Sequence, residues 1–412
     1  MRRLSRSRFL MFLAVIGPGI ITAAADNDAG GITTYSVAGA LYRYDLLWVI
    51  VLITFVLAMI QEMCARMGVV TQKGLGELIR ENFGVKWTMF ALGTLLIANL
   101  ATTAAEFAGI AASLELFGLS RYITVPIAGI VIWLLVVKGT FKTVERVFMA
   151  LTILYATYIV AGIMAHPHWP TVIHATFVPS FNTSPGFVFL AIAVIGTTIT
   201  PWMQFFLQAT VVDKGVRVEN YKYQKWDVYI GSVLTDIVSF FIIVAAGATV
   251  YGKVHGSEIT AVQIAQALAP VAGKYAEVLF ALGLFNASLL AAAVLPLSTA
   301  YTYSEAFGWE IGVSRRFSEA PIFYGIFTFS IIFGAIVVLL PNPGLIQIMI
   351  NAQAISGILL PVILIFMLKL INRKDVMGKY TNGPIYNIAV WAMAIVLIMM
   401  TLLWLVGLIF GF

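Results

Sequence analysis

Five carboxylates lie inside stretches of sequence that are otherwise apolar: Asp26, Asp28, Glu62, Glu106 and Asp236. A carboxylate inside a bilayer costs several kcal/mol unless it is paired, protonated or facing water. Every Lys and Arg can be placed at the end of an apolar stretch or in a connection, so no buried cation is expected to pair with these acids. Their charge must then be balanced by protons, water or a transported cation, and the sequence predicts a cation pathway.

Two of the apolar stretches are also interrupted. Residues 25–31 read Ala-Asp-Asn-Asp-Ala-Gly-Gly, a composition that disfavours continuous helix. Residues 197–201 read Thr-Thr-Ile-Thr-Pro, and Pro201 lacks the N–H that would bond the carbonyl of Thr197. Backbone freed at membrane depth is tolerated only where it lines a cavity or coordinates a ligand. The two breaks therefore mark the expected binding site.

The composition of the chain indicates a membrane protein. Its 412 residues are 61% hydrophobic and only 11% charged, whereas a soluble domain carries about 25% charged residues. The single cysteine, Cys64, excludes a disulfide framework and a multi-Cys metal site. Since no nucleophile–base pair and no Cys/His metal cluster appears, we expect neither an enzyme nor a bound cofactor.

Apolar runs bounded by charges or by Pro and Gly predict an all-α polytopic membrane protein with eleven transmembrane helices. The expected spans are 10–41 (interrupted), 46–68, 87–116, 122–138, 143–165, 186–212 (interrupted), 228–251, 275–304, 320–340, 344–370 and 386–411. A broken helix opening each five-helix half is typical of an inverted-repeat transporter. We expect one transmembrane domain, with a first repeat over about 9–180, its inverted partner over about 181–372 and an additional helix at 386–411.

The positive charges predict how the chain crosses the membrane. If the N-terminus is cytoplasmic, most of the 25 Lys and Arg fall in cytoplasmic segments, and the exceptions are Arg43, Arg121, Lys253 and Lys274. An odd number of spans then places the C-terminus outside. We expect a multi-pass protein of the plasma membrane, and we attribute the net charge of +6 to this topology rather than to nucleic-acid binding. The sequence implies no oligomer.

Polar residues on other spans fit a lined pathway. Asn99, Thr102, Thr103 and Glu106 recur at steps of three and four, so they share one helix face. Gln347 and Asn351 share a face in the same way, with Gln353 nearby. The single acids Glu62 and Asp236 either belong to the pathway or form hydrogen bonds in the packing.

Several segments together carry a family resemblance. They are Gly17-Pro18-Gly19, the break at Asp28, and residues 44–49 (Tyr-Asp-Leu-Leu-Trp-Val), 65–71 (Ala-Arg-Met-Gly-Val-Val-Thr), 105–109 (Ala-Glu-Phe-Ala-Gly), 290–293 (Leu-Ala-Ala-Ala) and 305–308 (Glu-Ala-Phe-Gly). Over about residues 15–370 the chain resembles the Nramp family of divalent-metal transporters. The resemblance implies a LeuT-type fold of two inverted five-helix repeats, in which helices 1 and 6 are broken.

The chain departs from this family at both breaks. The family motif Asp-Pro-Gly-Asn of the first helix reads Asp-Ala-Gly-Gly at residues 28–31, so the Asp is kept and the Asn ligand is missing. The motif Met-Pro-His of the sixth helix reads Thr-Pro-Trp at residues 200–202, which replaces the Met ligand and the His associated with proton handling. These changes resemble the Nramp-related magnesium transporters, a branch of the family.

The resemblance also implies a set of groups around the transported ion. They are the carbonyl of Ala25, the carboxylate of Asp28, the carbonyl of Thr197 and the hydroxyl of Thr200, with Gly31 and Gln353 lining the site. From charge alone we add Asp26 as a second carboxylate, which could instead face a vestibule. Glu106 matches an acid of the family's proton route, and Trp202 in place of His interrupts that route.

The missing Met changes the metal that the site favours. A thioether is a soft ligand that selects transition metals, whereas carboxylate, hydroxyl and carbonyl oxygens suit Mg²⁺. We therefore expect import of largely hydrated Mg²⁺, with Mn²⁺ tolerated, by alternating access and without proton coupling. The alternatives are a proton-coupled Mn²⁺/Fe²⁺ importer of the classical Nramp type, a cation-coupled amino-acid carrier on the same fold, and a channel.

Overall fold

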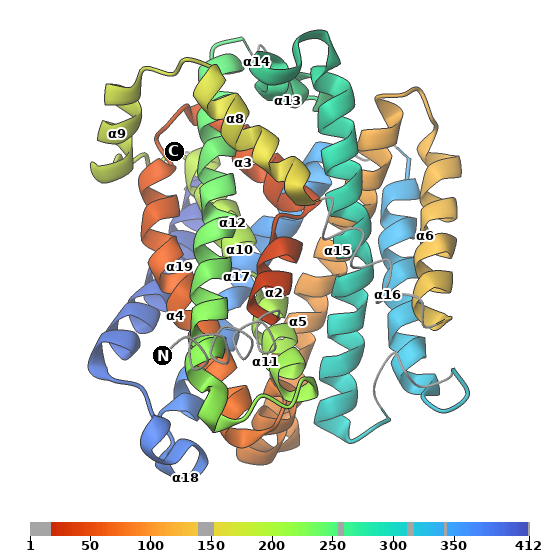
Figure 1. Ribbon diagram of the computed structural model, residues 1–412, viewed down its shortest axis with the longest axis vertical. Coiled ribbons are helices and arrows are strands. Elements are labelled where there is room, and N and C mark those ends of the chain that lie inside the picture. Colours follow the sequence, from red (N-terminus) through yellow and green to blue (C-terminus); the bar gives the residue numbers. More distant parts are fainter. Residues whose placement is uncertain (1–17, 139–151, 254–258, 311–316, 342–343, 411–412) are drawn as a thin grey trace, which may run out of the picture.

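The computed structural model describes residues 18–138, 152–253, 259–310, 317–341 and 344–410, and this part of the chain contains helices and no strands (Figure 1). The N-terminal half contains α2 (Pro18–Asp26), α3 (Ala29–Tyr42), α4 (Leu47–Thr71), α5 (Leu75–Glu115), α6 (Arg121–Val137), η1 (Thr152–Tyr155), α8 (Ala156–Met164) and α9 (Trp169–Phe177). The C-terminal half contains α10 (Pro185–Thr198), α11 (Pro201–Asp213), η2 (Val218–Asn220), α12 (Tyr221–Thr249), α13 (Ala261–Ala265), η3 (Gln266–Leu268), α14 (Ala269–Ala272), η4 (Gly273–Tyr275), α15 (Ala276–Phe307), α16 (Pro321–Leu339), α17 (Leu345–Ile371), α18 (Lys374–Met377), η5 (Gly378–Tyr380) and α19 (Pro384–Phe410).

The predicted all-α membrane fold is confirmed. Eight helical segments of the described residues are long and apolar enough to cross a membrane: α4, α5, α10 with α11, η2 with α12, α13 to α15, α16, α17 and α19. The other predicted spans coincide with shorter helices, namely α2 with α3, α6, and η1 with α8. Residues 143–151 of the fifth predicted span lie outside the described residues. The count of eleven therefore stays a prediction.

Both predicted helix breaks are present. The first helix stops at Asp26 and restarts at Ala29, and the carboxylate of Asp28 caps the new helix by accepting a hydrogen bond from the Gly31 N–H at 2.5 Å. The second pair of half-helices, α10 and α11, stops at Thr198 and restarts at Pro201. Proline suits a first helical position because its fixed φ fits the helix and its missing N–H would have no helical partner. Residues at the breaks themselves thus explain each one: Asp28 as an N-cap at the first and Pro201 as a first helical residue at the second.

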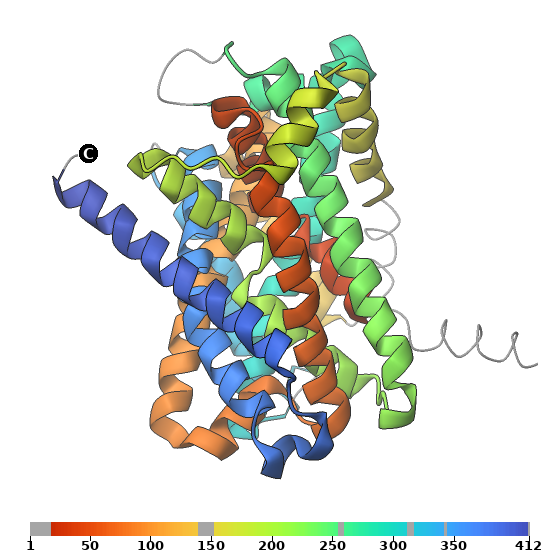
Figure 2. The ribbon, with the colours of Figure 1, turned by 90° about the vertical axis from the view of Figure 1, so that its left-hand side faces the viewer.

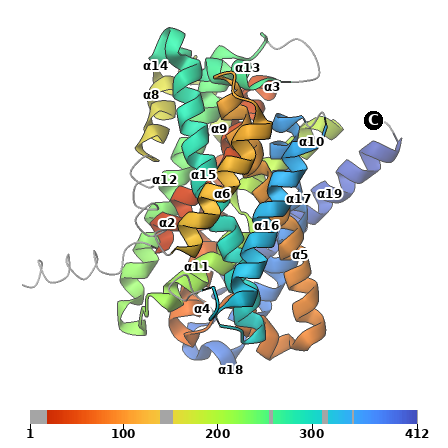
Figure 3. The same ribbon diagram turned by 90° about the vertical axis from the view of Figure 1, so that its right-hand side faces the viewer.

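Two long helices position the broken ones. The helix α12 packs on α2, α3 and α4, while α5 packs on α15 and α17. Glycine permits the closest approach: a Cβ added at Gly357 of α17 would lie 2.5 Å from the carbonyl oxygen of Ile192 in α10. On the outside of the bundle α6 and α16 lie side by side (Figure 3), joined by a hydrogen bond from Trp133 to Thr328 at 2.8 Å.

The connections divide between two ends of the bundle. The turns after α4, α11 and α17 lie at the end occupied by α18, whereas the turn after α3 lies at the opposite end with α13 and α14 (Figure 1). The last helix, α19, crosses the bundle obliquely (Figure 2). Connections that carry Lys73, Lys214 and Arg373 therefore share one end, and those that carry Arg43 and Lys253 share the other.

One sequence expectation about charge is wrong. Glu62 was expected to lack a buried cation, yet the guanidinium of Arg66 lies 3.2 Å from its carboxylate, and both side chains are buried. The reason is that α4 continues to Thr71, so Arg66 lies inside the helix rather than at its end. Arg66 also donates to the carbonyls of Tyr380 and Thr381 at 3.1 and 3.3 Å. Glu62 is thus a packing residue that helps to hold the segment before α19.

Candidate metal site

Asp28 is the centre of the candidate site. Its carboxylate is buried, with 2% of the residue exposed, and it accepts from Gly31 and from the side chain of Gln353. An ionised carboxylate can only accept hydrogen bonds, so the amide nitrogen of Gln353 faces it and the amide oxygen points elsewhere. That oxygen, Oε1, is buried and has no hydrogen-bond partner among the described residues. The structure therefore brings Gln353, which the family resemblance places in the site, to the carboxylate of Asp28.

Gly31 lies where three oxygens converge. A Cβ placed on Gly31 would lie 3.0 Å from Oγ1 of Thr197, 3.2 Å from Oδ1 of Asp28 and 3.3 Å from the carbonyl oxygen of Asp26. These oxygens come from α10, from the residue between α2 and α3, and from the end of α2. Oxygen atoms from both broken helices thus surround the position that a larger side chain would occupy.

Other buried oxygens at the two breaks have no partner. The hydroxyl oxygens of Thr197 and Thr200 and the Oε1 atom of Glu106 lack hydrogen bonds within the described part of the chain. Buried polar atoms are nearly always hydrogen-bonded, so orphaned acceptors at one place indicate a missing ligand. Hydroxyl, amide and carboxylate oxygens can all coordinate a hard divalent cation. Sequence reasoning selected the carbonyl of Thr197, whereas the structure points also to its hydroxyl.

Glu106 lies beside the capped end of α3. Its Oε2 atom accepts from the N–H of Ala29 at 3.2 Å, and its carboxyl group contacts that of Asp28. Two carboxyl groups in contact disfavour ionisation of both, and a cation bound beside them favours the ionised forms. Tyr155 of η1 interacts electrostatically with both acids, and its buried hydroxyl has no hydrogen-bond partner among the described residues. Sequence reasoning missed Tyr155, because nothing in its local sequence distinguishes it from a packing tyrosine.

The predicted residues Ala25 and Asp26 lie in the last turn of α2, just before the break. The carbonyl that approaches Gly31 belongs to Asp26, while Ala25 is a buried residue of the preceding turn. The carboxylate of Asp26 bonds to Thr235 of α12, whose hydroxyl also accepts from the side chain of Asn27 at 2.7 Å. The side chain of Asp26 thus faces α12.

The remaining predicted residues, Trp202, Asn99 and Asn351, contact side chains other than Asp28. Trp202 is buried in the first turn of α11, with its ring 5.8 Å from that of Phe206. Asn99 donates to Thr299 of α15 at 2.8 Å, which joins two long helices. Asn351 is exposed and accepts from Gln347 at 2.6 Å, so these two share a face as predicted without reaching Asp28.

The site is closed toward the end of the bundle that carries α13. One turn beyond Gly31 and Gln353, the hydroxyl of Thr33 donates to the sulfur of Met349 at 3.3 Å, and both residues are fully buried. Beyond this contact lies a cavity of about 570 Å³, lined among others by Val37, Glu115 and Gln347. The structure therefore holds the Asp28 site away from solvent, with a vestibule on one side.

No group of three or more His, Cys, Asp or Glu side chains in the described residues forms a conventional metal cluster. The candidate site instead combines carboxylates with neutral oxygens at two broken helices, an arrangement that defines a class of membrane transporters with discontinuous helices. The model of the family described as "Natural resistance-associated macrophage protein-like" (Nramp) matches residues 19–407. The chain belongs to the Nramp family, and it is a multi-pass membrane transporter rather than an enzyme.

Similar proteins and structures agree with this family. The divalent metal cation transporter MntH of Deinococcus radiodurans is 28% identical over 410 residues, which cover 95% of this chain and 90% of that one. MntH of Erwinia tasmaniensis is 32% identical over 292 residues, which cover 69% and 70%. A crystal structure of the Eremococcus coleocola manganese transporter aligns with a TM-score of 0.80 at 20% identity, covering 97% of this chain and 87% of that one. MhsT in complex with L-phenylalanine aligns at 0.56 and 16% identity, covering 94% and 98%, and the fold is thus LeuT-type.

Proposed function

We propose that the protein imports divalent metal ions by alternating access and that its preferred ion is Mg²⁺. The observation that carries the proposal is the convergence of oxygens of Asp28, Thr197 and Asp26 beside Gly31. Mg²⁺ dehydrates reluctantly and is bound through few carboxylates together with several waters. A site with one central carboxylate and neutral oxygens suits a partly hydrated Mg²⁺ ion better than a stripped transition metal.

Position 200, at the second break, carries no sulfur ligand, which supports the preference for Mg²⁺ over transition metals. A sulfur ligand would select Mn²⁺ or Fe²⁺ against Mg²⁺, and position 200 carries Thr, whose buried hydroxyl lacks a partner in the described part of the structure. Met349 lies one turn away, where its sulfur accepts from Thr33. We therefore expect Mg²⁺ and Mn²⁺ both to be carried, with Mg²⁺ preferred over Ca²⁺ because the site is compact.

Import without proton coupling is the second part of the proposal. Trp202 cannot take up a proton as His would, since the indole N–H is only a donor. The membrane potential supplies about 2.3 kcal/mol per charge per 100 mV, or about 4.6 kcal/mol for a divalent ion. That energy concentrates the ion about a thousandfold, so no proton gradient is required. Import needs the cytoplasmic N-terminus and plasma-membrane location that the charge distribution supports, with repeats over about 9–180 and 181–372 moving against each other.

Uptake by proteoliposomes tests both parts. Vesicles with an inside-negative potential and an internal pH reporter are given Mg²⁺, and Mn²⁺ and Ca²⁺ are added as competitors. We expect saturable Mg²⁺ uptake, competition by Mn²⁺, weak competition by Ca²⁺, and no internal acidification beyond that of empty vesicles. Acidification that follows metal entry contradicts the uncoupled mechanism. Uptake of Mn²⁺ that excess Mg²⁺ leaves unchanged contradicts the magnesium preference.

A proton-coupled Mn²⁺ or Fe²⁺ importer is the second candidate. One observation favours it: the carboxyl groups of Glu106 and Asp28 are in contact, and such a pair can hold a proton that metal binding would displace. The printed names of the relatives, a manganese transporter and MntH, point to the same class of ion. The acidification measured above separates this candidate from uncoupled transport. An amino-acid carrier is disfavoured because acids, rather than cationic groups, surround the break.

A further inference from the structure

A stripe of polar residues runs along the buried side of α12. It consists of Ser232, Thr235, Asp236 and Ser239, which share one side of the helix at 3.6 residues per turn, and all four are buried. The helix packs on α2 and α4, so this stripe lies against the inner half of the first broken helix. A buried polar stripe in an apolar bundle needs a function, since each buried polar group costs free energy unless it is satisfied.

Asp236 is the least satisfied member of this stripe. Only 3% of the residue is exposed, and neither carboxylate oxygen has a hydrogen-bond partner among the described residues. The Thr54 hydroxyl beside it already donates to the carbonyl of Ile50 at 2.7 Å. Asp26 is also 3% exposed and lies on the facing helix, because its neighbour Asn27 donates to Thr235, the neighbour of Asp236, at 2.7 Å. The Oδ1 atom of Asp26 likewise lacks a partner in the described structure.

Three carboxylate oxygens on two different helices thus lack a hydrogen-bond partner among the described residues, and the two acids carry a charge of about −2 when both are ionised. A hard cation is the ligand that satisfies such oxygens. We propose that Asp26 and Asp236 form a second cation site, through which the transported divalent ion passes between the Asp28 site and the end of the molecule where α12 begins. This inference rests on the proposed function, because it makes the same ion the ligand of both sites.

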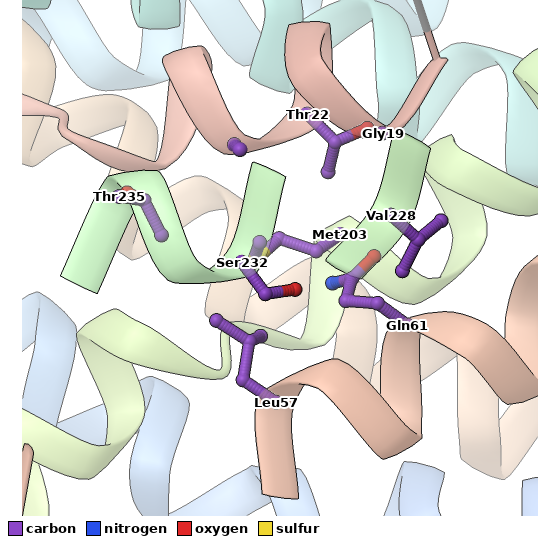
Figure 4. Close-up of a pocket in the computed structure, with 9 residues that line it drawn as sticks. Gly19, Thr22, Leu57, Gln61, Met203, Val228, Ser232 and Thr235 are labelled. Atoms are coloured by element: carbon purple, nitrogen blue, oxygen red, sulfur yellow. The ribbon is translucent and has the colours of Figure 1, made fainter. Parts of the chain in front are cut away.

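A small pocket lies beside Thr235, the residue before Asp236, toward the start of α12. It is lined by Thr22 of α2, Gln61 of α4, Met203 of α11 and Ser232 and Thr235 of α12 (Figure 4). Its volume of about 10 Å³ is just large enough for one water molecule. The amide nitrogen of Gln61 is buried and has no partner in the described residues, and amide orientations are assigned rather than observed, so this side chain can present oxygen to the pocket.

The far end of the pocket is closed by α2. The N–H of Gly19 donates to the carboxylate of Asp227 at 2.7 Å, and a Cβ added at Gly231 would lie 2.8 Å from the carbonyl oxygen of Gly19. The pocket therefore opens when the start of α2 separates from α12. The ion then has a polar route from Asp26 and Asp236 along Thr235 and Ser232.

The substitution Asp236→Asn tests the second site when Mg²⁺ uptake is measured in proteoliposomes with an inside-negative potential. We expect the maximal rate of Mg²⁺ uptake to fall at least tenfold, while the Mg²⁺ concentration for half-maximal uptake changes less than threefold, because Asp28 is untouched. Asp236→Glu keeps the charge and is expected to retain at least a third of the wild-type rate. Glu219→Gln, which removes an exposed acid just before α12, is the matched control and keeps the wild-type rate.

Binding of Mn²⁺ to the detergent-solubilised variants, followed by electron paramagnetic resonance, establishes that they are folded. We expect Asp236→Asn to bind Mn²⁺ at the Asp28 site within threefold of the wild-type affinity. If Asp236→Asn does not fold, Asp26→Asn is the second variant, with the same expected fall in rate.

Three results overturn the proposal: a wild-type rate in Asp236→Asn, equal losses in the Asn and Glu variants, or a Na⁺ requirement of the wild type that Asp236→Asn abolishes. The last result would assign the site to a coupling ion. Absence of Mg²⁺ uptake by the wild type contradicts the proposed function instead, so the two failures are distinguishable.

Discussion

The side-chain amide of Gln353 donates to both carboxylate oxygens of Asp28, at 3.4 and 3.3 Å. This contact joins α17 to the break between α2 and α3, two segments that are far apart in the sequence. It orients the central carboxylate and leaves the Oε1 atom of Gln353 directed away from Asp28 without a partner among the described residues. A residue in this position can bind the ion and hold its main ligand at once.

Removal of the Gln353 amide is expected to weaken metal binding. A hydrogen bond to a charged group contributes about 1.5–3 kcal/mol, and every 1.4 kcal/mol corresponds to a factor of ten, so Gln353→Ala should raise the half-saturating Mg²⁺ concentration about tenfold or more. Concentration-dependent uptake measures this change. Asn351→Ala is the control, because the exposed side chain of Asn351 accepts from Gln347 and makes no hydrogen bond to Asp28 within the described residues. Equal values for Gln353→Ala and the wild type would remove Gln353 from the site.

A methyl group at Gly31 is expected to fill part of the space that the ion and its waters need. The added Cβ would lie 3.0–3.3 Å from three oxygens, which is tight for carbon and displaces any water there. We expect Gly31→Ala to reduce the maximal rate of Mg²⁺ uptake at least about tenfold, and to reduce Mn²⁺ uptake less, because Mn²⁺ gives up waters more readily than Mg²⁺.

The control for this substitution is Gly283→Ala, since a Cβ at that buried helical position meets no atom within 4 Å. Its Mg²⁺ uptake should match the wild type. A loss at Gly283 similar to that at Gly31 would mean that the rate responds to helix packing in general, and the hydrated-ion interpretation would lose its support.

The substitution Thr200→Met is expected to change which metal is preferred. A thioether stabilises transition metals relative to Mg²⁺, and the Thr200 hydroxyl makes no hydrogen bond within the described residues that the change would disrupt. We predict that the ratio of Mn²⁺ to Mg²⁺ uptake rises by about tenfold, or 1.4 kcal/mol. Thr200→Ser, which keeps the hydroxyl, should leave the ratio unchanged. The interpretation fails if Met and Ser at this position give the same ratio.

How much the sequence could predict depends on the range of the interaction. The breaks at Asp28 and Pro201 follow from local chemistry, so both were predicted to within a few residues. The pairing of Gln353 with Asp28 rested on family resemblance, because the two residues are separated by 325 positions. Tyr155 could not be found in the sequence, since its electrostatic interaction with the two acids arises only from tertiary packing.

The misjudged charges have a physical explanation of the same kind. Arg66 and Asp227 each lie near the end of an apolar run, where a sequence assigns them to a connection with water. In the fold, Arg66 contacts Glu62 and the segment before α19, and Asp227 accepts from Gly19 at the start of α2. Gly19 and Asp227 are 208 positions apart, so their contact cannot be found from local sequence. Arg66 and Glu62 are only four positions apart, and helical spacing could have indicated that pair. Hydropathy alone carries no information about such contacts.

The contact between Arg66 and Glu62 predicts a change in stability. Breaking a buried ion pair from one side leaves an uncompensated charge and costs about 3 kcal/mol, so Arg66→Met should lower the thermal unfolding temperature in detergent markedly. The double substitution Glu62→Gln with Arg66→Met should recover part of the loss. Arg373→Met removes an exposed pair with Asp375 and should leave the temperature unchanged. If the exposed and the buried substitutions have equal effects, Arg66 does not hold α19 in place.

The most direct test of the account is Mg²⁺ uptake by the wild type and by Asp28→Ala in proteoliposomes at one imposed membrane potential. The account predicts saturable uptake by the wild type and a loss of at least about a hundredfold in Asp28→Ala, because the variant removes the carboxylate that Gly31 and Gln353 orient and leaves the ion without its charged ligand. Binding of Mg²⁺ that persists in Asp28→Ala together with an unaltered uptake rate would contradict the claim that this carboxylate carries the ion.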